Sequence, residues 1–313
     1  MNDKFIYIVG RILQAIPTII IITVLVFLMV RLIPGDPATV MLGMKATPER
    51  VEALTKYMGL DKPIHIQFLV FLQNISKGQL GDSIILRTPV TVLIQNRLPI
   101  TIFLAFYAVF IAVLASIPLS LLTALKKDSW FDQAVRMVLM TMLSTPSFWF
   151  GIILLIVFGV KIPIFPVGGV REGFTNRLQD LFLPAVTLSL HMTAVLTRNM
   201  RDNIISILQS EHIVFAHAKG LRERLIFVRH VLRNAAISGV TIVGLYLSWM
   251  VGGSVVIETV FAIPGMGYTM IQGIMGRDYI VVQGLTMVFG ILVSIIYLLN
   301  DIVYSFLDPR VTL

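Results

Sequence analysis

The stretch at residues 98–125, LPITIFLAFYAVFIAVLASIPLSLLTAL, runs for 28 residues without a charged side chain. A helix rises about 1.5 Å per residue, so a run of this length can cross the roughly 30 Å hydrocarbon core of a bilayer. We therefore expect a transmembrane helix here, and the remaining runs of the same kind define the fold class.

Five further uncharged runs are long enough to span a bilayer. The first of them is followed by Arg31 and a Pro-Gly-Asp-Pro segment at 34–37 rather than by the small residues of a secretory cleavage site, so we interpret it as an uncleaved helix. The sequence predicts an all-α integral membrane protein with six transmembrane helices in a single domain, residues 1–313. The five runs lie at residues 12–30, 137–160, 181–197, 234–257 and 279–300.

The composition agrees with a membrane environment. Hydrophobic residues make up 57% of the chain and charged residues only 13%, about half the usual charged fraction of a soluble domain. The net charge of +8 is that of a nucleic-acid-binding protein or of a membrane protein with basic loops, and we favour the second interpretation, with lipid and not nucleic acid as a partner. The absence of cysteine excludes disulfides, thiol catalysis and cysteine-based zinc sites.

The basic residues are distributed unevenly between the two sets of polar segments. One set, which includes both termini, holds 13 of them, whereas the two short segments of the other set hold only Lys161, Arg171, Arg177 and Arg277. Basic residues concentrate in cytoplasmic loops, so we expect both termini to be cytoplasmic. Residues 31–97 then form a large extracytoplasmic loop and residues 198–233 a cytoplasmic loop.

The extracytoplasmic loop has local structure of its own. Thr47 is suited to cap a helix that begins at Pro48 and continues to Tyr57, and turns are expected at Gly59 and near 78–81. From the residues alone, a lid or spacer and a contact surface for an external partner both remain open.

Catalytic motifs are missing from the sequence. There is no Gly-x-x-x-x-Gly-Lys-Ser/Thr loop for a nucleotide, no His-Glu-x-x-His, and no metal-like spacing among the five histidines, so we expect neither a catalytic nor a metal site. A secondary transporter or channel would carry ionisable groups within its spans, and the best candidates are Glu258 and Asp301. We interpret both as solvated or capping residues, which places energy coupling outside this chain.

The cytoplasmic loop contains a short helix-capable segment at 210–221, SEHIVFAHAKGL. Glu211 suits the positive N-terminal end of a helix, and Gly220 suits a left-handed residue at its C-terminal end. Ala216 and Gly220 are four residues apart and would leave a face with almost no side chain. This pattern favours a docking helix over an ordinary loop helix.

The sequence resembles the six-helix permease subunits of binding-protein-dependent ABC importers of the dipeptide, oligopeptide and nickel family. The coupling motif of that family, an acidic residue followed by Ala-x-Ala-x-Gly, is similar to residues 211–221, although His217 replaces the usual Arg, Glu211-His212 replaces Asp-Tyr, and Ile280 replaces a Pro in another motif. The other matching segments are 31–37 (RLIPGDP), 59–63 (GLDKP) with Gln67, 81–83 (GDS), 230–235 (HVLRNA), 252–254 (GGS) with Glu258 and Phe261, 264–267 (PGMG), 277–279 (RDY) with Gln283, and 307–310 (LDPR).

The resemblance implies a permease subunit in a bacterial or archaeal cytoplasmic membrane, working with a second permease subunit, two ATPase subunits and an extracytoplasmic substrate-binding protein. ATP and Mg²⁺ would bind the ATPases, and this chain would hold no cofactor. Peptides are the expected cargo, with nickel, glutathione or oligosaccharide as alternatives and a stand-alone secondary transporter or channel as the competing class. The implied ATPase-docking residues are Glu211, Ala216, Ala218, Lys219, Gly220 and Leu221, and the implied binding-protein contacts are Gly59, Leu60, Asp61, Gly81 and Asp82.

Overall fold

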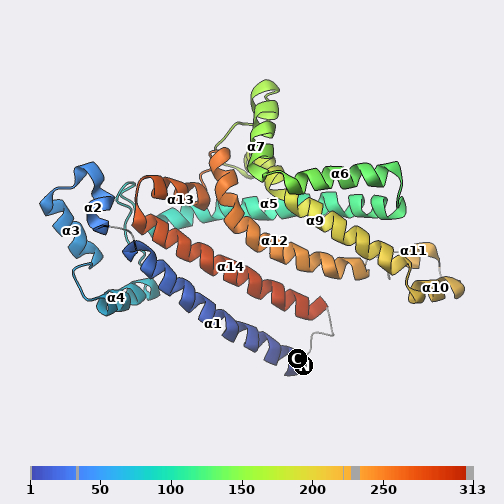
Figure 1. Ribbon diagram of the computed structural model, residues 1–313, viewed down its shortest axis with the longest axis horizontal. Helices are drawn as coiled ribbons and strands as arrows, with labels where there is room; N and C mark the ends of the chain where they lie inside the picture. Colours follow the sequence, from blue (N-terminus) through green and yellow to red (C-terminus); the bar gives the residue numbers. More distant parts are fainter. Residues whose placement is uncertain (1, 33–34, 221, 227–232, 308–313) are drawn as a thin grey trace.

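The computed structural model describes residues 2–32, 35–220, 222–226 and 233–307. Within these ranges the regular secondary structure is helical, apart from one isolated bridge between Asp82 and Pro89. The long helices lie side by side, with the short helices α2–α4 at one end of the bundle and α10 and α11 at the other (Figure 1). The first turns of α1 and the last turns of α14 lie toward the same end as α10.

Five long helices account for five of the six predicted spans, although the span predicted at 181–197 begins one residue later, at Phe182. Four of them are long and apolar enough to cross a membrane unaided, over Val9–Arg31, Val90–Leu125, Gly239–Val260 and Tyr279–Val303. Helix α5 begins at Val90, so the last residues of the predicted extracytoplasmic loop already belong to it. The full helices are α1 (Asn2–Arg31), α5 (Val90–Leu125), α9 (Phe182–Leu208), α12 (Arg233–Val260) and α14 (Tyr279–Leu307).

In the described residues the other two candidate spans are bent helix pairs, one of which includes α9. The run at 137–160, predicted as one span, is divided between α6 (Trp130–Ser144) and α7 (Ser147–Leu155), which continues as a π-helix to Lys161, and the bend between the two measures 102°. The cause is Pro146, because the residue before a proline is driven out of the helical region and Thr145 is extended, with φ −104° and ψ 135°. Helix α8 (Phe174–Asp180) is similarly bent by 56° against α9, so the described chain has four spans, or up to six if each bent pair counts as one.

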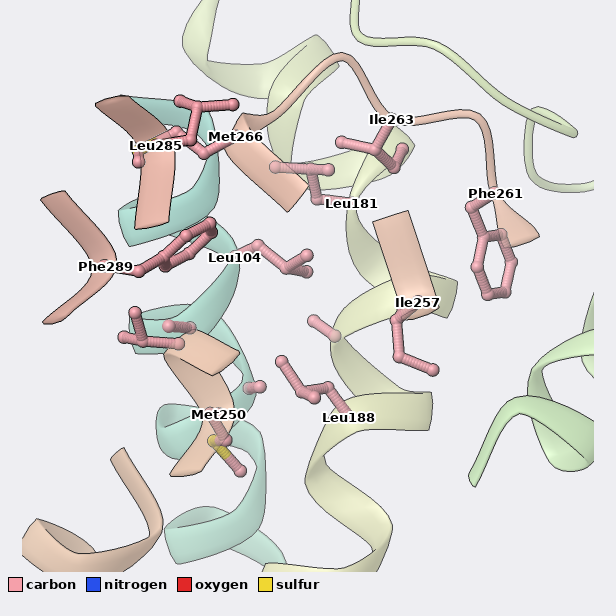
Figure 2. Close-up of a cluster of buried hydrophobic side chains, with 14 of the residues drawn as sticks. Leu104, Leu181, Leu188, Met250, Ile257, Phe261, Ile263, Met266, Leu285 and Phe289 are labelled. Carbon is pink, nitrogen blue, oxygen red and sulfur yellow. The ribbon is translucent and has the colours of Figure 1, made fainter. Parts of the chain in front are cut away.

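The bundle centre is formed by α5 and α9, which are covered by α12, α13 (Met266–Met275) and α14. Figure 2 shows their buried apolar side chains converging from these five helices. Small residues on one face of α5, at Ala105, Ala108, Ala112 and Ser116, allow a close approach of the helix backbones, as is usual in membrane bundles. The hydroxyl of Ser116 also reaches the Thr193 carbonyl of α9 at 3.3 Å.

Large apolar side chains also cover much of the outside of the bundle. Helix α1 packs against α14 and leaves Leu13, Ile20 and Leu25 more than half exposed, and Phe106 and Phe110 of α5 are similarly exposed. A soluble protein rarely exposes apolar surface so continuously, whereas lipid or a neighbouring membrane subunit would cover it.

Candidate functional site

The predicted docking segment is a separate helix at one end of the bundle (Figure 1). Helix α10 runs from Glu211 to Ala218, with Glu211 in its first turn. Gly220 has φ +72°, which confirms the predicted left-handed residue after the helix. A side chain added at Gly220 would meet no described atom within 4 Å, so this point is open to a partner.

One side of α10 is anchored to the bundle. Ile213 is buried with Ala124 at the end of α5, Ile204 on α9 and Ile226 on α11 (Glu223–Ile226). Since one face is fixed by this apolar contact, the opposite face can be presented as a rigid surface.

The exposed part of α10 carries an apolar and a basic group. Phe215 is 61% exposed, and the Lys219 ammonium lies 4.6 Å from the centre of its ring. Ala218 is exposed as well. Of the other predicted docking residues, Ala216 is described through its backbone, as part of α10, and Leu221 lies outside the described residues.

At the opposite end of the bundle, the loop that was predicted to be extracytoplasmic folds into the short helices α2 (Pro37–Leu42), α3 (Pro48–Met58) and α4 (Ile64–Ser76). Thr47 caps α3 by accepting the Arg50 N–H at 3.4 Å, and Gly59 ends it with φ +64°, which confirms both sequence-based predictions. The loop is therefore a folded cap and not an extended spacer.

The turn at 59–62 between α3 and α4 is clamped to the end of α1. The Gln67 amide donates to the carbonyls of Lys62 at 2.7 Å and Leu60 at 3.2 Å, and its oxygen accepts the Arg31 Nε–H at 2.9 Å. Asp61 remains exposed on this fixed turn, and Leu60 is half-buried. The clamp makes Asp61 a suitable surface contact.

Gly81 and Asp82 have a different environment from Asp61. Gly81, at φ +86°, lies so close to Ile280 that an added Cβ would be 2.7 Å from its Cγ2. The Asp82 carboxylate accepts the Tyr57 hydroxyl at 2.7 Å, and burial, followed by this contact, raises the pKa of Tyr57. Gly59, Gly81 and Asp82 line a cavity of about 560 Å³ between α3, α4 and the start of α14, whereas Leu60 and Asp61 do not.

The same end contains a buried carboxylate whose role the sequence did not reveal. Asp278 accepts the Ser83 hydroxyl at 2.7 Å and the Ile85 N–H at 3.1 Å, and its other oxygen accepts the Val281 N–H at 3.3 Å. It therefore caps α14 and attaches the folded loop to the bundle at the same time. Its partner Ser83 is 195 residues away in sequence, so no local pattern could have identified the pair.

Glu258 forms a second buried carboxylate cap. It is fully buried, accepts the Thr101 hydroxyl of α5 at 2.7 Å, and accepts the Tyr268 N–H in the first turn of α13 at 3.0 Å. The capping interpretation of Glu258 is confirmed and the solvated alternative is wrong. Asp301 pairs with Arg11 at 3.2 Å, which joins the adjacent ends of α1 and α14.

The close contact at Glu258 explains the glycines of the 264–267 segment. A Cβ added at Gly265 would lie 2.4 Å from the Glu258 carboxylate, and one at Gly267 would lie 2.5 Å from the Val255 Cα. The glycines thus allow the N-terminus of α13 to approach the carboxylate directly. A carboxylate six residues before a Pro-Gly-x-Gly helix start was the signal in the sequence that could have suggested this cap.

This bundle of apolar helices, with short helices at each end, fits the class of inner-membrane transport components. The profile described as "Binding-protein-dependent transport system inner membrane component" matches residues 116–313, and the profile for its N-terminal component matches residues 4–105. The chain belongs to this family and is a multi-pass inner-membrane protein.

Relatives with established or provisional names cover nearly the whole chain. A protein of Brucella suis biovar 1, provisionally named a peptide transport system permease, is 39% identical over 97% of this chain and 98% of its own length. The oligopeptide transport system permease AppB of Bacillus subtilis is 37% identical, and the glutathione transport system permease GsiC of Pectobacterium atrosepticum is 35% identical, each with the same coverage of both chains.

Proposed function

We propose that this chain is the permease subunit of an ATP-driven ABC importer for di- and oligopeptides, and that it forms half of the pathway together with a second, similar permease subunit. The observation that carries the proposal is near-full-length similarity to peptide and oligopeptide permeases, on a bundle with a separate docking helix at one end. A substrate-binding protein delivers the cargo from outside the membrane.

ATP hydrolysis takes place on two separate ATPase subunits in this proposal. The chain has no phosphate-binding loop of its own, so ATP and Mg²⁺ bind those subunits and this chain holds no cofactor. Helix α10 faces the cytoplasm and inserts into a groove on an ATPase subunit, a common way for a short helix to dock. Closure of the ATPases then moves α10 and changes which side of the membrane the pathway faces.

The test of ATPase docking is a charge placed at the open end of α10. Gly220→Glu puts a long acidic side chain at a point with no described neighbour, and we expect loss of ATPase co-purification and of ATP-dependent uptake. Gly78→Glu is the matched control, because Gly78 also has φ +72° and open surroundings among the described residues but lies at the other end of the bundle. Retained co-purification and uptake in Gly220→Glu would reject the docking role.

At the opposite end, the turn with Asp61 contacts the docked binding protein. Asp61→Lys reverses an exposed charge on a clamped turn, and we expect weaker uptake with the complex still assembled. Gln73→Lys, an exposed position on α4, is the control. Unchanged uptake in Asp61→Lys would argue against this contact. A deletion of residues 59–81 would be less informative, because it would also remove the close contact between Gly81 and Ile280.

The cargo is tested with the assembled complex and its binding protein. We expect competition of uptake by di- and oligopeptides, while competition by glutathione alone would favour the second candidate, which the 35% identity to a glutathione permease supports. Competition by nickel or oligosaccharide alone would contradict both. Gradient-driven transport by the isolated chain in vesicles, without ATPase subunits, would instead support a stand-alone secondary transporter or channel.

A further inference from the structure

A buried ion pair joins α6 to α9 close to the docking helix. The Arg201 guanidinium makes two parallel contacts with the Asp132 carboxylate, Nε to Oδ1 at 2.8 Å and Nη2 to Oδ2 at 2.6 Å. Asp132 is fully buried and Arg201 is 8% exposed. A bidentate contact of this kind fixes both the distance and the angle between α6 and α9, whereas the single contact of a lysine would not fix the angle.

The same carboxylate also organises the connection between α5 and α6. Asp132 accepts the backbone N–H of Asp128 at 3.0 Å, and its own N–H donates to the Ser129 hydroxyl that caps α6. Arg136 lies 3.7 Å from the carboxylate, and a further nitrogen of Arg201 contacts Asp202 at 3.0 Å. The pair therefore holds the ends of α5 and α6 as well as α9.

An apolar contact lies one turn further along α9. Ile204 follows Arg201 by three residues and shares its face of the helix, and it packs in the cluster that includes Ala124 of α5 and Ile213 of α10. Between the ion pair and the docking helix, α9 is thus attached to α5 and α6 by a polar contact and then by an apolar one. Figure 1 shows these helix ends converging beside α10 and α11.

We propose that the Asp132–Arg201 pair and the Ile213 cluster form one rigid joint that transmits movement of α10 to α5 and α6 as well as to α9. Asp132 and Arg201 are then positioning residues for transport. This inference rests on the proposed function, because it requires that α10 is moved by an ATPase. The attraction within a buried ion pair only offsets the free energy lost when the two charges leave water. A well-packed apolar contact would therefore stabilise the fold equally well, so stability alone does not explain the pair.

The first test compares transport per ATP hydrolysed in assembled complexes with the variants Asp132→Asn, Arg201→Gln and the double variant. We expect each single variant to keep the ATPase subunits but to lose roughly three- to thirtyfold in transported cargo per ATP, the range of coupling effects at positions between two sites. The double variant should recover part of this loss, because two neutral amides can still bond to each other. Normal transport per ATP in both single variants would overturn the proposal.

A second test applies even where a single variant fails to fold. The natural chain has no cysteine, so Ala124→Cys with Ile213→Cys places a unique thiol pair across the joint. The two thiols are then crosslinked with a bifunctional thiol reagent that reduction can cleave. If the proposal is right, the crosslinked complex transports as much cargo per ATP as the same complex after the crosslink has been cleaved. Transport that stops on crosslinking and returns on reduction would show that α10 moves relative to α5, which would overturn the proposal of a rigid joint. Failure of the wild-type chain to bind any ATPase would instead reject the proposed function.

Discussion

Thr101 is the position at which one atom connects three elements of the bundle. Its hydroxyl donates to Glu258 at 2.7 Å and accepts the Met266 N–H at 2.9 Å, while Thr101 itself is fully buried on α5. Thr101→Val keeps the shape of the side chain and removes both hydrogen bonds. The carboxylate and the N–H are left buried, each with one partner fewer.

The expected cost follows from those two contacts. An unsatisfied buried donor or acceptor costs about 1–3 kcal/mol, so two of them would cost about 2–6 kcal/mol. The Glu258 carboxylate keeps the Tyr268 N–H, so we expect the free energy of unfolding to fall by about 2–4 kcal/mol, in the lower part of that range. At about 2–4 °C per kcal/mol for a large domain, the thermal midpoint of the purified protein in detergent should fall by about 4–16 °C.

The assay is thermal unfolding monitored by size-exclusion chromatography, with Thr101→Ser as the matched control. Serine keeps the hydroxyl and loses one methyl group, so its midpoint should change by less than half as much. Equal midpoints for Thr101→Val and Thr101→Ser would refute the reasoning, because the hydroxyl would then contribute nothing to the attachment of α13.

Two further substitutions probe the attachment to α14 of the folded cap that contains α2–α4. Gly81→Ala should lower the thermal midpoint more than Gly78→Ala does, because both positions have positive φ but only Gly81 would place a Cβ at 2.7 Å from Ile280. Equal losses of thermal midpoint in the two variants would show that backbone strain alone, and not the contact with Ile280, determines the effect of Gly81→Ala. Ser83→Ala should cost about 1–3 kcal/mol, because its hydroxyl bonds to the buried Asp278 carboxylate, and unchanged resistance of the cap to limited proteolysis would contradict that attachment.

Features that depend on neighbouring residues were predictable from the sequence. The Thr47 cap and the Gly59 end of α3 are set by residues within one helix and its flanks, and the left-handed Gly220 follows the same logic. Four spans could be located because apolar length is the physical requirement for crossing a membrane. The break at Thr145 was missed because the apolar length of a run shows that it can span a membrane but not whether the helix bends within it. Pro146, which causes the break, was visible in the sequence.

Features that join distant segments could not be predicted. Glu258 was recognised as a possible cap, but its partner Thr101 is 157 residues away. The predicted contact set 59–61 and 81–82 also contained two kinds of residue, since Asp61 is exposed whereas Gly81 packs against Ile280. A shared family pattern gathers both kinds together, and only the tertiary contacts separate a surface residue from one that supports the fold.

The central claim is that the end of the bundle with α10 meets an ATPase subunit, and one crosslinking measurement tests it directly. A single cysteine at the exposed Ala218 is unique in the chain, and so is one at the exposed Asp61 at the opposite end. In the assembled complex, Ala218→Cys with a short thiol crosslinker should yield an adduct with an ATPase subunit and Asp61→Cys should not. An ATPase adduct from Asp61→Cys, or none from Ala218→Cys in a complex that hydrolyses ATP, would contradict the account.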